Sequence, residues 1–138
     1  MFLTSLDRFR DIGLLILRFG WGWAYLWIHG GPKIFGGMER WEKLGGAMGY
    51  VGIDFAPAFW GFMASLSEFG GAILLALGLF FRPALIFMFI TMVMAAVSHL
   101  GRGDNLGMAS HAIENAIVFA ALFLTGPGKY SLDEKWKK

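Results

Sequence analysis

Residues 14–37 form an apolar stretch long enough to enter a membrane, and this stretch carries three ionisable side chains, Arg18, His29 and Lys33. Successive residues of an α-helix turn by about 100°, so Arg18 and His29 lie about three turns apart and Lys33 follows about one turn later. The spacing predicts one polar stripe on an otherwise apolar helix. In lipid, such a stripe faces neighbouring helices, because a charge exposed to hydrocarbon is costly.

The composition of the whole chain is typical of an integral membrane protein. Of its 138 residues, 57% are hydrophobic and 16% are charged, and the mean hydropathy is +0.57. A soluble domain is about half apolar and about a quarter charged. The length suits one domain, residues 1–138. The net charge of +2 does not favour nucleic-acid binding, and a chain without cysteine cannot use thiolate chemistry or disulfides.

Four apolar segments predict an all-α fold, an integral membrane bundle of four transmembrane helices. The expected spans cover residues about 12–34, 58–81, 84–100 and 108–125. A short helix at the membrane interface is expected in the polar first loop, where Trp41, Leu44 and Met48 are spaced for one apolar face. After the last span we expect a charged, soluble tail.

Lys and Arg residues predict the orientation of the spans. They are more numerous at the N-terminus, in the turn after the second span and in the tail than in the other two loops. Cytoplasmic loops carry this excess. We therefore expect a multi-pass protein of the plasma (inner) membrane with both termini in the cytoplasm.

Several polar side chains of the four spans are expected at similar depth, where they would line an outward-facing polar cavity. The candidate ligand-binding residues are Arg18, His29, Lys33, Glu68, His99 and Glu114. The long side chain of Arg18 is expected to reach Glu68, since each would otherwise be an uncompensated buried charge.

Structural interpretations of these residues remain open. An Arg18–Glu68 pair could serve only to fix helix packing, Lys33 and His99 could reach lipid headgroups from span ends, and Glu114 suits the first turn of a helix. The aromatic residues of the first span are expected to face lipid or the interface; they are Trp21, Trp23, Tyr25 and Trp27. The three histidines and Glu114 lack the spacing of a metal motif, so no metal is predicted.

Four segments, in this order and spacing, resemble the DoxX family of small four-helix membrane proteins. They are LRFGWGWAYLWIHGGPKIFG, SLSEFGGAILLALGLFFRPA, VSHLGRGDN and HAIENAIVFAALFLTGPGKYSLD, and they carry all six candidate residues. The resemblance implies a redox setting, because relatives include the small membrane subunit of a thiosulfate:quinone oxidoreductase. It does not by itself transfer an activity, since one fold hosts many functions.

The residues and the resemblance together favour a subunit of a membrane redox system that interacts with a quinone or docks a redox partner. Such a subunit need not be catalytic itself. Arg18, His29 and Lys33 could donate hydrogen bonds to quinone oxygens, and Glu68 and Glu114 could relay protons. The quinone would be held without a covalent bond, and a partner protein would supply electrons. Two other classes stay open: a small transporter or channel for an anion or a proton, and a membrane scaffold without chemistry. Homo-oligomers are also left open.

Overall fold

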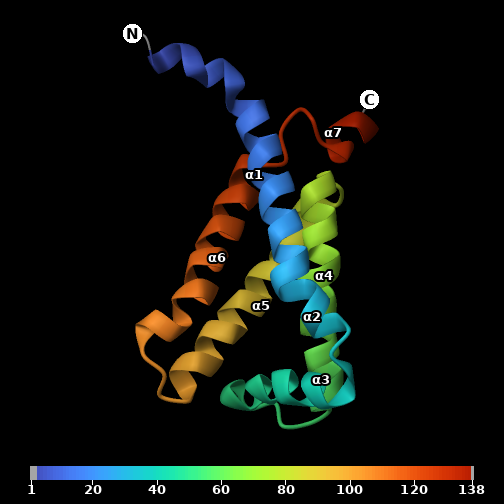
Figure 1. Cartoon of the computed structure of the whole chain (residues 1–138), viewed down its shortest axis with the longest axis vertical. Coiled ribbons are helices and arrows are strands. Elements are labelled where there is room, and N and C mark those ends of the chain that lie inside the picture. The colour runs from blue at the N-terminus through green and yellow to red at the C-terminus, as the bar shows by residue number, and fades with distance from the viewer. Residues whose placement is uncertain (1–2, 138) are drawn as a thin grey trace.

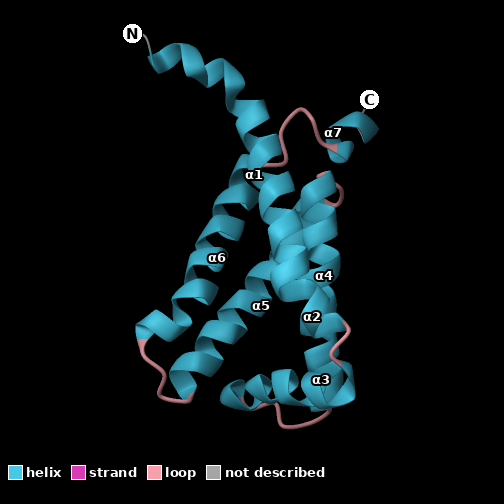
Figure 2. Ribbon diagram, in the orientation of Figure 1, coloured by secondary structure: helices cyan, strands magenta, loops and turns pink. Residues whose placement is uncertain are grey.

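The computed structural model describes residues 3–137, and this part of the chain is helical throughout, with no β-strand. Long helical stretches run along the molecule, short loops join them, and α3 lies across one end (Figures 1 and 2). Both termini lie at the other end (Figure 1). The elements are η1 (Leu3–Phe9), α1 (Arg10–Tyr25), η2 (Leu26–Gly30), α2 (Gly31–Ile34), α3 (Gly37–Gly45), η3 (Gly46–Val51), α4 (Pro57–Leu77), α5 (Phe81–Gly101), α6 (Leu106–Thr125) and α7 (Leu132–Trp136).

Three helices, α4, α5 and α6, are long and apolar enough to cross a membrane, with 21, 21 and 20 residues. They correspond to the last three predicted spans, and their ends differ from the prediction by a few residues. A fully buried apolar core lies between the long stretches and includes Leu75, Phe81, Met88 and Phe119. The membrane character and the all-helical class predicted from the sequence are therefore confirmed.

The first predicted span, residues 12–34, is helical but not one regular α-helix. It consists of α1 with 16 residues, the π-helical turn η2 with five and α2 with four. A π turn accommodates an extra residue, so side chains beyond it are rotated relative to a continuous α-helix. The single stripe expected for Arg18, His29 and Lys33 is consequently divided.

The helix α4 ends four residues before the predicted end at position 81, because Gly78 takes a left-handed conformation with φ of 64°. The amide of Leu79 donates to the carbonyl of Leu74 at 3.0 Å, and that of Gly78 donates to Leu75 at 3.2 Å. These are the two hydrogen bonds of a Schellman motif, which satisfy terminal carbonyls of the helix.

The predicted helix in the first loop is present as α3, followed by the 3₁₀ turn η3. This segment crosses α4 at very short range. A Cβ atom added at Gly61 of α4 would lie 1.7 Å from the carbonyl oxygen of Trp41 on α3. Only glycine permits this approach, so Gly61 fixes where α3 passes the end of α4.

The C-terminal segment is docked on the bundle, so the expectation of a freely solvated tail is wrong. Ser131 is fully buried, and the carboxylate of Asp133 accepts hydrogen bonds from the amides of Phe80 and Phe81, both at 2.9 Å. These amides belong to the N-cap residue and the first residue of α5, and N–H groups at a helix N-terminus have no partner within the helix. The segment after α6 therefore caps α5 from a distant part of the sequence.

Candidate functional site

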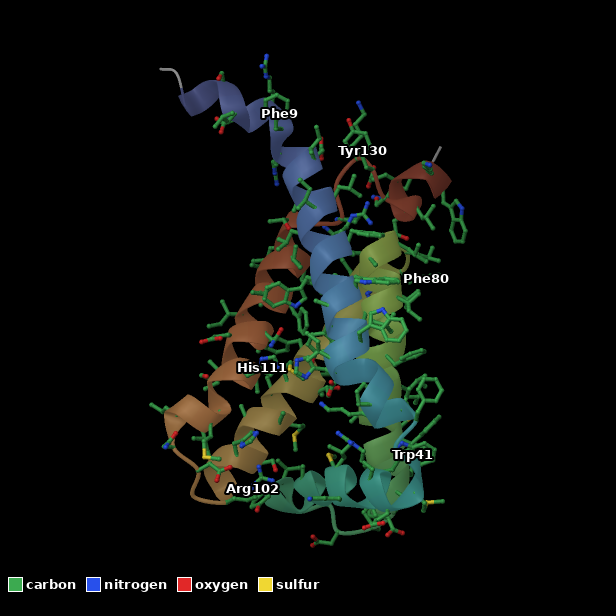
Figure 3. The ribbon with its side chains drawn as sticks, in the orientation of Figure 1. Phe9, Trp41, Phe80, Arg102, His111 and Tyr130 are labelled. Atoms are coloured by element: carbon green, nitrogen blue, oxygen red, sulfur yellow. The ribbon has the colours of Figure 1, made fainter. Side chains whose placement is uncertain are left out.

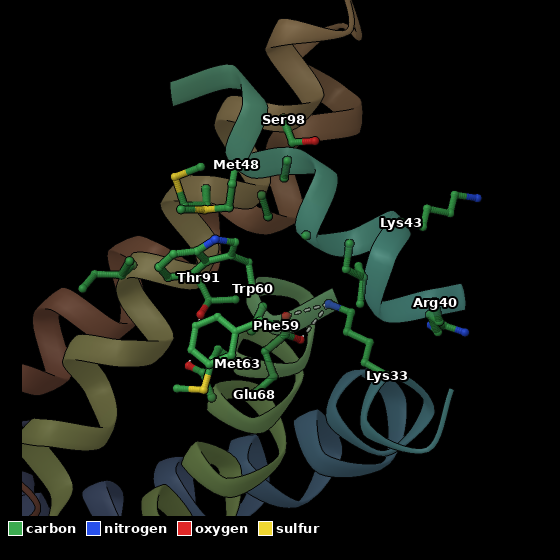
Figure 4. A pocket seen from close by; sticks show the side chains of 18 of the residues that line it. Lys33, Arg40, Lys43, Met48, Phe59, Trp60, Met63, Glu68, Thr91 and Ser98 are labelled. Carbon is green, nitrogen blue, oxygen red and sulfur yellow. Dashed lines mark hydrogen bonds and ion pairs between the residues drawn. The ribbon is translucent and has the colours of Figure 1, made fainter. Parts of the chain in front are cut away.

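A cavity of about 1080 Å³ lies between α3, α4 and α5, near the end of the molecule opposite the termini. Its walls are mostly apolar, with polar groups at a few positions. Lys33 of α2, Trp60 and Glu68 of α4, Thr91 of α5 and Met48 of η3 are among its lining residues (Figure 4). Ligand pockets typically combine apolar walls with a small number of placed polar groups, and this cavity has that character.

A buried ion pair forms part of the cavity wall. Lys33 Nζ lies 2.7 Å from both carboxylate oxygens of Glu68, whose side chain is 2% exposed (Figure 4). The hydroxyl of Tyr25 donates to Glu68 Oε2 at 3.3 Å. Two of the three ammonium protons of Lys33 are thus directed to Glu68, which leaves one donor for another acceptor.

Trp60 lines the cavity and carries a second polar group near it. Its indole Nε1 is buried and has no hydrogen-bond partner among the described residues. It lies two helical turns before Glu68 on the same face of α4. Buried polar groups in proteins nearly always have a partner, and this indole N–H is one of two buried side-chain donors without one among the described residues.

His29 lies in the turn η2 and faces α6, outside this cavity. Its ring stacks on His111 with centroids 4.4 Å apart, and it contacts the ring of Tyr25 at 4.9 Å. His111 extends from α6 toward the first helical stretch (Figure 3). On α6, Asn115 Nδ2 donates to the backbone carbonyl of His111 at 2.7 Å, and Asn115 Oδ1 accepts a hydrogen bond from Trp21 Nε1 at 3.2 Å. Polar groups thus continue from Glu68, through Tyr25, to the α1–α6 side.

His99 lines the cavity at the end of α5 and contacts the following loop. Its Nδ1 lies 2.8 Å from Asp104 Oδ2, and Arg102 Nη2 lies 3.3 Å from the same oxygen. The hydrogen bond from His99 is the main reason that the pKa of Asp104 is lowered from its ordinary value. His99 therefore has a local structural partner in addition to its position at the cavity.

Arg18 does not meet Glu68, so the expected pairing of these two residues is wrong. Its guanidinium donates to the backbone carbonyls of Ala76, at the end of α4, and Tyr130, in the C-terminal segment. The physical reason is depth: Arg18 lies level with Ala76, which follows Glu68 by eight residues on α4, or about 12 Å along the helix. Carbonyls at a helix C-terminus carry a partial negative charge that favours a cation.

Glu114 also lies apart from the cavity. It is exposed on α6 and makes no hydrogen bond or ion pair with a described residue, although His111 on the same helix contacts His29 of η2. Of the six predicted site residues, the cavity brings together Lys33, Glu68 and His99.

Sequence reasoning missed the roles of three residues near the site. Tyr25 was expected to face lipid, yet it is 4% exposed and bonds Glu68, while Trp23 and Trp27 are exposed as predicted. Trp60 and Asn115 were not among the predicted site residues either. The spacing of Trp60 and Glu68, eight residues apart on one helix, was the available signal for Trp60.

The sequence was compared with family models, curated proteins and solved structures, and one family model matches it. The model of the DoxX family matches residues 13–101, which is more than half of the chain. The chain belongs to the DoxX family. The DoxX match includes α4, α5 and nearly all of the cavity lining, and it ends before α6. The search of curated proteins found no match, and the search of solved structures found none.

Proposed function

We propose that this DoxX protein binds an amphipathic ligand of the quinone class in the cavity between α3, α4 and α5, as a membrane subunit of a redox system. The observation that carries this proposal is the pairing of apolar walls with two donors, the ammonium of Lys33 and the unpaired indole N–H of Trp60. Quinone oxygens are hydrogen-bond acceptors on an apolar body, which fits such a lining.

The residues around Glu68 suit a ligand that takes up protons. A bound quinone supplies redox chemistry by accepting two electrons and two protons. Lys33 holds the Glu68 carboxylate in the cavity wall, and Tyr25 fixes one of its oxygens. A positioned carboxylate can exchange a proton with a ligand within hydrogen-bond reach. We propose that electrons come from a partner protein, which makes this chain a non-catalytic subunit.

We further propose that the first helical stretch is a fourth membrane span. The elements α1, η2 and α2 follow one another without a break from Arg10 to Ile34. At about 1.5 Å per residue they extend about 37 Å, and the hydrocarbon core of a bilayer is about 30 Å thick. With four spans in the plasma (inner) membrane, both termini lie on one side, which the excess of Lys and Arg assigns to the cytoplasm.

Quinone binding to the purified protein in detergent tests this function. We expect a soluble quinone analogue to bind saturably by calorimetry, and Glu68→Gln to weaken binding at least tenfold. Glu114→Gln is the matched control, since it makes the same chemical change at an exposed position outside the cavity. Absence of saturable binding to the wild type, or equal losses in the two variants, would contradict the proposal.

A second candidate function is transfer of a proton or an anion across the membrane. It is favoured by a row of neighbouring side chains: Lys33, Glu68 and Tyr25 are joined by an ion pair and a hydrogen bond, and the rings of Tyr25, His29 and His111 are in contact. Flux into proteoliposomes that contain only this protein would support transport. Full function in the host from a Lys33→Met, Glu68→Leu double variant would instead favour a scaffold without chemistry.

A further inference from the structure

A second pocket, of about 360 Å³, lies at the opposite end of the molecule, beside the chain termini. The starts of α1 and α5, the loop after α6 and the helix α7 surround it. Four cationic side chains line this pocket from four segments: Arg10, Arg82, Lys129 and Lys137. Two carboxylates, Asp11 and Glu134, line it as well. The lining therefore carries an excess of positive charge.

Both carboxylates already have partners. Asp11 Oδ1 accepts a hydrogen bond from the backbone amide of Lys129 at 3.0 Å, and Glu134 Oε1 lies 2.6 Å from Lys137 Nζ. The side chains of Arg10 and Lys129, in contrast, make no hydrogen bond or ion pair with any described residue. The charges that remain available to a ligand are therefore cationic.

Arg82 adds a partly committed guanidinium to the same pocket. Its Nε donates to the carbonyl of Phe123 at 3.1 Å, which directs the group toward the end of α6. Its Nη atoms make no hydrogen bond with the described residues and can bind an anion. A planar guanidinium binds phosphate oxygens in a bidentate manner, and a lysine adds a compact point charge.

Exposed aromatic residues surround this end of the molecule. Trp136, Phe80 and Tyr130 are 68%, 58% and 50% exposed, and the rings of Phe80 and Trp136 meet edge to face at 6.2 Å. Amphipathic aromatic side chains collect at the level of lipid headgroups. The exposed aromatic residues therefore favour a position of this end of the molecule at the headgroup level.

We propose that this pocket binds the phosphate headgroup of an anionic phospholipid. Arg10, Arg82 and Lys129 contact the phosphate oxygens, and Leu14 at the inner wall contacts the start of the acyl chains. Basic pockets between membrane helices bind anionic headgroups in this way. The site is independent of the quinone cavity, with which it shares no lining residue.

A simpler explanation is that these basic residues only set the orientation of the chain. That explanation predicts attraction to any anionic surface in proportion to the number of charges removed. A pocket predicts instead that the position of each charge matters. The two explanations can be separated with variants of equal charge at the same end of the molecule.

The experiment measures the melting temperature and lipid retention, by native mass spectrometry, of the purified full chain. The probes are phosphatidylglycerol, phosphatidylcholine and inorganic phosphate. Phosphatidylglycerol is expected to be retained and to raise the melting temperature, whereas phosphatidylcholine is not. The variant Arg10→Gln, Lys129→Gln should weaken phosphatidylglycerol retention at least tenfold. The control Arg8→Gln, Lys135→Gln removes the same charge outside the pocket and should behave as the wild type.

Three outcomes would overturn the proposal. The first is equal retention of phosphatidylglycerol and phosphatidylcholine by the wild type. The second is an equal loss of phosphatidylglycerol retention in the pocket variant and the control variant, which would indicate diffuse attraction. In the third, inorganic phosphate alone stabilises the protein as strongly as the lipid, which would make a free anion the ligand. If the double variant fails to fold, Lys129→Gln replaces it, with an expected loss of about threefold, and unchanged retention there would contradict the site.

Discussion

Lys33 Nζ lies 2.7 Å from each carboxylate oxygen of Glu68, and this ion pair joins the end of the first helical stretch to the middle of α4. Glu68 is almost completely buried, whereas Lys33 is 20% exposed at the cavity. The pair therefore has two consequences: it fixes helix packing, and it places an ammonium where a ligand can reach it.

Breaking this ion pair on one side should destabilise the protein more than removing both partners. Lys33→Met leaves the Glu68 carboxylate buried without a cation, at a cost of about 3–5 kcal/mol for a fully buried pair. Lys33→Met, Glu68→Leu should recover part of that loss. Denaturant unfolding in detergent gives the free energy of unfolding of the wild type, of Lys33→Met, of Glu68→Leu and of the double variant. If the losses of the two single variants simply add in the double variant, the two side chains are not coupled.

Arg18 is expected to stabilise the docked C-terminal segment. Arg18→Met removes the hydrogen bonds to Ala76 and Tyr130, and a hydrogen bond to a charged group contributes about 1.5–3 kcal/mol. The variant should lose stability and expose the segment, so that trypsin cleaves at Lys129 and Lys135 faster than in the wild type. Arg8→Met, at an exposed position in η1, is the control and should leave the cleavage rate unchanged.

Denaturant unfolding also tests whether Arg18 acts independently of the ion pair between Lys33 and Glu68. Arg18 and Glu68 share no hydrogen-bond partner among the described residues, so the effects of Arg18→Met and Glu68→Leu should add within about 0.5 kcal/mol. A larger coupling free energy would mean that Arg18 does approach Glu68 in the membrane.

Gly61 should tolerate no side chain. In Gly61→Ala the new methyl group would overlap the carbonyl of Trp41, and forced overpacking costs about 1–3 kcal/mol. Gly70→Ala on the same helix meets only the Leu66 side chain, at 3.9 Å. This control should be neutral or stabilising by up to about 1 kcal/mol, because alanine favours helix. Equal stabilities of the two variants would argue against the close crossing of α3 and α4.

The orientation can be tested with single cysteines, because the chain has none. We expect a cysteine at Glu42, exposed on α3, to react with a membrane-impermeant thiol reagent in intact cells. A cysteine at Lys135, exposed on α7, should react only after the cells are opened. Labelling of the Lys135 position in intact cells would reverse the orientation and place the cavity on the cytoplasmic side.

The sequence by itself determined the membrane class, the last three spans to within a few residues and the helix in the first loop. These features depend on local hydropathy, on proline and glycine at helix ends and on the spacing of apolar residues, all of which can be read along the chain. It also singled out Glu68, since a lone carboxylate in an apolar segment needs a partner.

Only the tertiary structure decided which cation meets Glu68. Arg18 and Lys33 are both long and positively charged, and helical spacing placed them on one stripe. The π turn at Leu26–Gly30 rotates the residues beyond it, and the position of α4 puts Lys33 beside Glu68 and Arg18 beside the end of the helix. The docking of Tyr130 on Arg18 joins residues 112 positions apart, and the stacking of His111 on His29 joins α6 to the first helical stretch. Such contacts depend on how whole helices pack, and no local pattern in a single sequence records that.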